Sequence, residues 1–101
     1  MTWSVEVSVD ALSDVDEAVA WYATEAPEQV ERLLADFDVG GRKVGFHPLT
    51  RAEFLPGRRR VHLQTFPYEL WYIVDEDEKR ATVIAVVHDR QDDRQFLERQ
   101  R

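Results

Sequence analysis

"RRRVHLQTFPYELWYIVDEDEKRATVIAVVH", residues 58–88, contains three runs rich in aromatic and β-branched residues. Runs of this kind, bounded by turn-forming or charged residues, predict strands at 58–64, 67–75 and 80–88. The acidic sequence DEDEK joins the last two. We interpret DEDE (75–78) as a solvated hairpin tip, because no calcium-loop spacing surrounds it. The sequence therefore predicts a three-stranded meander.

A strand and a helix are expected at the start of the chain. Residues 2–10 alternate between polar and apolar side chains, which predicts a half-buried strand. Apolar residues then recur at helical spacing from Leu12 to Tyr22. Asp10 or Ser13 is expected to cap the start of this first helix.

A second helix is expected to begin at Pro27. The pair Gly40-Gly41 predicts a stop or a severe bend, since two interior glycines cost a helix about 2 kcal/mol. Residues 47–57 form a turn-rich connection, and the last residues form a short helix. The prediction is one α+β domain over residues 1–101: an N-terminal strand, a helical hairpin, a three-stranded antiparallel meander and a short C-terminal helix.

The composition excludes several classes of protein. The chain has no cysteine, which excludes disulfides, a thiol nucleophile and a cysteine-based zinc site. The start does not resemble a signal peptide, and the longest aliphatic run, residues 83–87, is too short to span a bilayer. We therefore expect a soluble, cytoplasmic protein without membrane contact.

The net charge of −7 is unevenly distributed. Residues 1–41 contain ten acidic residues and one basic residue, whereas residues 42–101 contain twelve basic and ten acidic residues. Affinity for nucleic acid rises with each cation that displaces a counterion from phosphate. Any role in nucleic-acid binding must therefore depend on a local patch in the second part of the chain.

Familiar catalytic motifs are missing. The four glycines form neither a phosphate-binding loop nor a dinucleotide fingerprint, and no serine has the setting of a nucleophile elbow. The histidines His47, His62 and His88 lack the spacing of metal ligands. We expect neither a cofactor nor a metal.

The order of the predicted helices and strands and the amino-acid sequence of residues 58–93 resemble the ParE/RelE toxin superfamily of bacterial and archaeal type II toxin–antitoxin systems. Further support comes from DVDEAVAWY in the first helix and from HPLTRAEFLPGRRR before the second strand. The arginine strand, the strand FPYELWY and the strand ending in HDR are most similar to the ParE-like branch, also called plasmid stabilisation proteins.

The resemblance implies two alternative activities. Proteins of the RelE-like branch cut messenger RNA on the ribosome, and an arginine of their third strand points at the scissile phosphate. The matching stretch here is Tyr68-Glu69-Leu70, so a carboxylate replaces that cation. Loss of one transition-state donor costs about 3–4 kcal/mol, and reversing its charge should cost more. Glu69 therefore argues against RNA cleavage. Glu69 is also expected to lie on the solvent face and to pair with a basic residue of a neighbouring strand, which is compatible with this argument.

Several residues are candidates for a functional site. Arg58, Arg59, Arg60 and Arg90 could bind the target or the antitoxin. Strand alternation predicts Arg58, Arg60 and His62 on one face, with Arg59 on the other. If the protein is an endoribonuclease, the catalytic candidates are His88, Arg90 and Arg60, although a histidine at a strand end is more often structural.

Two residues of the connection before the arginines, His47 and Glu53, are further acid–base candidates. The aromatic residues, by contrast, are interpreted as core: Trp21, Tyr22, Trp71 and Tyr72.

The prediction for function is a ParE-like toxin that acts by binding a cellular target, with DNA gyrase as the candidate, and is neutralised by a cognate antitoxin. It is not expected to be an enzyme. The alternatives are a ribosome-dependent mRNA endonuclease and a non-toxic binding module. Antitoxins of this superfamily add a helix or a strand to the toxin, so an exposed apolar groove or a free sheet edge is expected.

Overall fold

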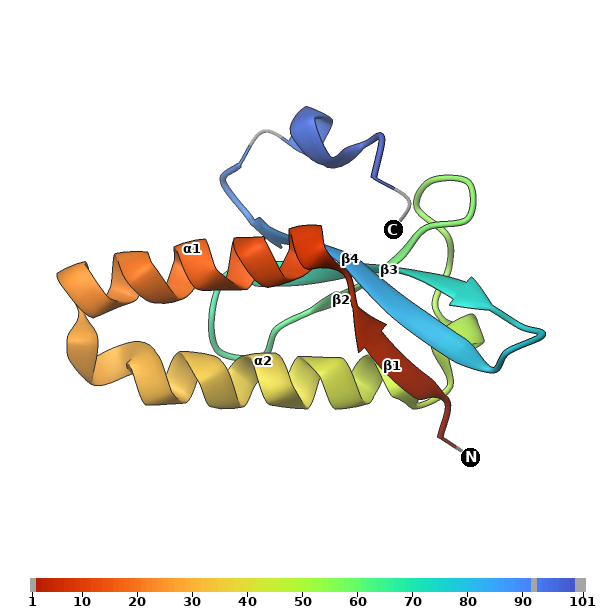
Figure 1. Cartoon of the computed structure of the whole chain (residues 1–101), viewed down its shortest axis with the longest axis horizontal. Helices are drawn as coiled ribbons and strands as arrows, with labels where there is room; N and C mark the ends of the chain where they lie inside the picture. Colours follow the sequence, from red (N-terminus) through yellow and green to blue (C-terminus); the bar gives the residue numbers. More distant parts are fainter. Residues whose placement is uncertain (1, 92, 100–101) are drawn as a thin grey trace.

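The computed structural model describes residues 2–91 and 93–99 and has α+β architecture, as the sequence predicts (Figure 1). A four-stranded sheet has the order β1-β4-β3-β2. Strands β2, β3 and β4 form the predicted antiparallel meander, whereas β1 pairs in parallel with β4. The sheet is therefore mixed and not wholly antiparallel. The elements are β1 (Ser4–Val7), α1 (Val9–Glu25), η1 (Pro27–Gln29), α2 (Val30–Gly45), η2 (Pro48–Thr50), β2 (Arg59–His62), β3 (Tyr68–Asp75), β4 (Arg80–His88) and the 3-10 helix η3 (Asp93–Phe96).

The two faces of the sheet are covered by different parts of the chain. Helices α1 and α2 form a hairpin whose apolar side chains pack with Leu70, Tyr72 and Val83 in the larger core. We call this side the helix face. On the opposite face, Trp71 packs in a smaller core with Phe96 of η3 and with Phe54. Phe54 belongs to the segment of residues 47–58 between α2 and β2, which we call the 47–58 connection. The predicted core roles of Trp71 and Tyr72 are confirmed, since both are fully buried.

A β-bulge in β4 decides which side chains reach each face. Trp71 pairs with Ala85 and Tyr72 pairs with Val83, so Ile84 is an extra residue between the two pairs. Because side chains alternate along a strand, the extra residue reverses the alternation beyond it. As a result, His88 lies on the helix face, opposite Tyr68, and the following residue lies on the other face.

Helix α2 continues through the glycine pair to Gly45, so the predicted stop at Gly40-Gly41 is wrong. Gly40 is buried against the sheet, and a Cβ there would lie 2.6 Å from Leu63 Cδ2. With a Cβ at this position the Leu63 side chain would have to shift, so the glycine permits the close approach of helix and sheet, and this packing offsets its low helix propensity. Gly41 has open space around it.

The strand expected at residues 2–10 is shorter because helix α1 begins at Val9. Ser8 is the N-cap, and its hydroxyl accepts a hydrogen bond from the backbone N–H of Ala11 at 3.1 Å. The predicted caps Asp10 and Ser13 lie inside the helix. Asp10 is instead a first-turn acid, where it interacts favourably with the helix dipole.

No helix within the described ranges combines the length and the apolar character that a bilayer span requires.

Candidate functional site

Glu69 is a buried carboxylate on the face of the sheet opposite the helices. Its Oε1 atom accepts a hydrogen bond of 2.7 Å from Trp71 Nε1 and one of 3.4 Å from Arg60 Nη1. Its Oε2 atom lies 3.5 Å from Nδ1 of His62, the residue directly opposite on β2. The expected pairing of Glu69 with a neighbouring basic residue is confirmed. The expected exposure to solvent is wrong, because the residue is only 8% exposed.

The arginines of residues 58–60 point in different directions. Arg60 lies with His62 on the Glu69 side, as alternation predicts, and its guanidinium is 4.6 Å from the centre of the Phe54 ring. Arg59 lies on the helix face, opposite Tyr72 in the register. Arg58 precedes β2 and forms an isolated bridge with Leu55, so the predicted strand is shorter at this end.

Arg59 and Glu53 stabilise the 47–58 connection. Arg59 Nε donates a hydrogen bond of 2.7 Å to the carbonyl of Arg51, and its Nη2 lies 3.4 Å from Glu53. Glu53 also accepts a hydrogen bond of 2.8 Å from the backbone N–H of Gly57. His47, the other acid–base candidate of this connection, is exposed and adopts a left-handed conformation with φ 57°. Arg59 and Glu53 therefore stabilise the conformation of this connection.

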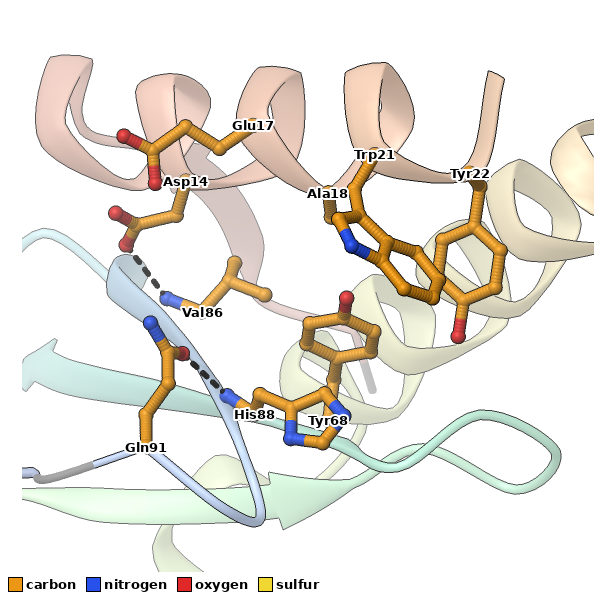
Figure 2. Close-up of a pocket in the computed structure, with 9 residues that line it drawn as sticks. All are labelled: Asp14, Glu17, Ala18, Trp21, Tyr22, Tyr68, Val86, His88 and Gln91. Carbon is orange, nitrogen blue, oxygen red and sulfur yellow. Dashed lines mark hydrogen bonds between the residues drawn. The ribbon is translucent and has the colours of Figure 1, made fainter. Parts of the chain in front are cut away.

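His88 lines a cavity of about 420 Å³ between the helix face and α1 (Figure 2). Its ring is 5.0 Å from that of Tyr68 in an edge-on arrangement, and its Nδ1 accepts a hydrogen bond from the backbone N–H of Arg90 at 3.0 Å. Burial raises the pKa of the Tyr68 hydroxyl, and the nearby Tyr22 raises it further. At neutral pH this hydroxyl therefore stays protonated and can donate a hydrogen bond into the cavity.

The α1 side of the cavity is acidic and aromatic. Glu17 and Trp21 are exposed on it, and Trp21 lies edge-on to Tyr22 with a centroid distance of 4.9 Å (Figure 2). The prediction of Trp21 as a core residue is wrong, since it is 58% exposed. Tyr22 is half-buried and packs on Phe66 in the larger core, as expected.

The catalytic candidates do not form one constellation. His88 lies on the helix face with Tyr68, whereas Arg60 lies on the Glu69 side. Arg90 follows β4 and is exposed. A general acid and a phosphate-binding cation must act on the same reacting group, which His88 and Arg60 cannot do from opposite faces of the sheet. Arg90 lies beside His88, since its backbone N–H donates to the His88 ring.

A second cavity, of about 730 Å³, is an apolar groove between β1 and α2. We call it the β1–α2 groove. Val7, Leu34 and Phe46 line it and are 43%, 46% and 56% exposed. β1 is also an edge strand of the sheet. The expected apolar groove and free sheet edge are thus both present and adjoin each other.

The sequence did not locate the groove, because Leu34 shares the apolar stripe of α2 with true core residues. Leu33 is fully buried, whereas its neighbour Leu34 extends beyond the contact with the sheet. The only indication in the sequence was that the apolar stripe of α2 is wider than the surface that one sheet can cover. Sequence reasoning also missed that the fold brings His62, Glu69 and Asp89 together, because His62 and Glu69 lie on different strands and Asp89 follows a third.

Comparisons with known proteins agree with this fold. A family model that describes the ParE toxin of the type II toxin–antitoxin system parDE matches residues 5–93. A search of curated protein sequences finds no significant match.

Several solved structures share the fold, among them these three. A chain of the chromosomal ParDE system from P. aeruginosa is 18% identical with a TM-score of 0.73, over 86% of this chain and 96% of that chain. A chain of the RelBE2 toxin–antitoxin complex from Mycobacterium tuberculosis is 17% identical with a TM-score of 0.60, over 87% and 92%. A free E. coli RelE toxin with two arginine-to-alanine substitutions is 18% identical with a TM-score of 0.54, over 89% and 86%.

At such identities the structures show a common fold, while the family model covers most of the chain. The resemblance to the ParE-like branch is therefore confirmed, and the chain belongs to the ParE toxin family of type II toxin–antitoxin systems.

Proposed function

We propose that this toxin inhibits growth by binding a cellular protein, with DNA gyrase as the candidate target, and that a cognate antitoxin neutralises it in the cytoplasm. The observation that supports binding over chemistry is the position of Glu69. Its carboxylate holds Arg60 at 3.4 Å on one face of the sheet, and His88 is on the other.

RNA cleavage by attack of a ribose hydroxyl needs cations around a phosphate whose negative charge increases in the transition state. Here the strand position that faces Arg60 and His62 is negative. A phosphate at this position would meet a buried carboxylate that the protein has already paired with its own cation. The alternative of an mRNA endonuclease therefore has less support than binding. The candidate residues for binding the target are Arg58, Arg59, Arg60 and Arg90, of which Arg59 and Arg60 lie on opposite faces of the sheet.

The β1–α2 groove is the proposed docking surface for the antitoxin. It combines exposed apolar side chains with an unpaired strand edge, which suits a segment that buries apolar residues and adds backbone hydrogen bonds. Two of the structural relatives come from toxin–antitoxin systems, which agrees with a partner of this class.

The test is to induce the full chain alone and to measure growth, plasmid topology and transcript integrity in the same culture. Binding to gyrase predicts growth arrest and loss of supercoiling while transcripts stay intact. Co-expression of the antitoxin encoded beside the gene should restore growth.

Cleaved transcripts that disappear with His88→Ala would instead support the endonuclease. Normal growth despite confirmed soluble expression would contradict toxicity. Arrested growth with unchanged plasmid topology would contradict gyrase as the target and leave binding to another protein.

A further inference from the structure

Three side chains from neighbouring strands meet at one end of the sheet, on the Glu69 side. His62 ends β2, Glu69 lies near the start of β3, and Asp89 follows β4. One ligand atom of each residue lies within 4.8 Å of those of the other two. We propose that His62, Glu69 and Asp89 form a binding site for a divalent first-row transition metal, with zinc as the preferred ion.

The distance between the first two ligand atoms suits zinc. His62 Nδ1 and Glu69 Oε2 are 3.5 Å apart. Two ligand atoms of a tetrahedral zinc ion, each about 2.1 Å from the metal, are roughly 3.4 Å apart. One imidazole nitrogen with two carboxylate oxygens is a borderline donor set, which favours zinc over magnesium or calcium.

Glu69 is oriented for this role by its other oxygen. Trp71 Nε1 donates to Oε1 at 2.7 Å, and this indole is fully buried. The contact fixes the carboxylate plane so that Oε2 points to His62. Hydrogen bonds of this kind to a ligating carboxylate are typical of metal sites, where they set the orientation of the ligand.

The bulge at Ile84 places the third ligand, Asp89, on the same face as Glu69. Glu69 pairs with Val87, and Asp89, two residues further on, projects to the same face. The backbone N–H of Asp89 donates to the carbonyl of Pro67 at 2.9 Å, which holds this residue beside the start of β3. His62 and Asp89 are exposed, so a metal ion can enter and a water molecule can occupy the fourth position.

The charges at the site also favour a cation. The two carboxylates outweigh the guanidinium of Arg60, whose side chain is 41% exposed and lies 3.4 Å from Oε1, the oxygen not used for the metal. With a neutral His62, the four side chains carry a net charge of −1. A divalent ion bound there would link β2, β3 and the end of β4, and would stabilise the folded state by mass action.

The test is calorimetric titration of the purified, untagged full chain with zinc chloride at pH 7.5 in a non-chelating buffer. We expect one equivalent of zinc to bind. Both His62→Ala and Asp89→Asn should weaken binding at least tenfold, since each removes one of three protein ligands. The matched control is His47→Ala, which removes an exposed histidine outside the site and should leave the affinity unchanged.

A second measurement separates loss of the site from misfolding. Cobalt chloride should give the visible absorption of a four-coordinate site in the wild type but not in His62→Ala, while both proteins keep the same circular dichroism spectrum. No measurable binding of either metal would overturn the proposal. So would binding that survives both substitutions, or that depends on His47.

Discussion

The indole Nε1–H of Trp71 donates a hydrogen bond of 2.7 Å to the carboxylate of Glu69, two residues earlier on the same strand. Both side chains are buried, so this carboxylate satisfies a donor that has no access to water. The acid in the middle of an apolar strand therefore has a structural role as well as an electrostatic one.

Replacing Glu69 should separate these roles. Glu69→Ala leaves the buried indole N–H without an acceptor, which should lower the free energy of unfolding by about 1–3 kcal/mol. Glu69→Gln retains an acceptor and should cost less. The measurement is urea unfolding at pH 7, with Glu76→Ala at the exposed hairpin tip as the control. Equal stability of Glu69→Ala and the control variant would contradict the structural role.

The two glycines of α2 should respond to alanine in opposite ways. Gly41→Ala adds a Cβ in open space and should stabilise the protein by about 1 kcal/mol through helix propensity. At Gly40, the Cβ would lie 2.6 Å from Leu63 and 3.0 Å from Leu70, so the overpacking should lower stability by about 1–3 kcal/mol. Thermal unfolding of both variants tests this pair. A Gly40→Ala protein as stable as Gly41→Ala would contradict this prediction and show that the side chains of Leu63 and Leu70 move aside at little cost.

The β1–α2 groove predicts the effect of a charge on the antitoxin complex. Leu34→Glu places a carboxylate in the groove and should weaken the complex at least tenfold, or about 1.4 kcal/mol. Leu12→Glu is the matched control, since Leu12 is a helical leucine of similar exposure outside the groove lining. Co-purification with the antitoxin and rescue of growth are the measurements. Equal complex formation by the two variants would place the antitoxin elsewhere.

Tyr72 predicts a loss of stability at alkaline pH. Burial raises the pKa of its hydroxyl, and the neighbouring Arg51 only partly opposes this. The folded state therefore holds this proton more tightly than the unfolded state. The resulting stability is fully present below the unfolded pKa of about 10 and is lost as the pH rises through the folded pKa.

Tyr72→Phe should make the alkaline decline shallower. It should also cost about 1 kcal/mol at neutral pH, because the hydroxyl donates a hydrogen bond of 2.7 Å to the carbonyl of Pro48. Unfolding free energies measured from about pH 7 to 11 test this expectation. The double variant Tyr68→Phe and Tyr72→Phe should show a still weaker dependence, since the pKa of Tyr68 is raised as well. An unchanged slope in the double variant would contradict the assignment.

The sequence predicted the individual helices and strands better than the way in which they pair and pack. Strand alternation in residues 58–63 placed Arg60 and His62 on one face and Arg59 on the other, as the structure shows. The run VIAVV (83–87) has no polar residue to mark the faces, so the bulge inside it could not be seen. The parallel pairing of β1 and the passage of α2 through Gly40 also depend on tertiary contacts that local propensity does not contain.

The sequence identified individual residues of the candidate site but not their arrangement in space. Glu69 was recognised as decisive, yet its burial depends on the Trp71 indole and on the cover from the 47–58 connection. The separation of His88 from Arg60 depends on one unpaired residue in β4. A site formed from three strands is sensitive to such small shifts, whereas one formed within a single helix is not.

The extra residue at Ile84 matters for any comparison with relatives at the identities seen here. A relative whose last strand runs without a bulge must be aligned with a one-residue gap at that point. Without the gap, its strand-end residues would be matched one position too early, so that a role belonging to Asp89 would be assigned to His88 and a role belonging to His88 to Val87. Alignments based on letters alone will make this error, because the hydrophobic run offers no landmark inside it.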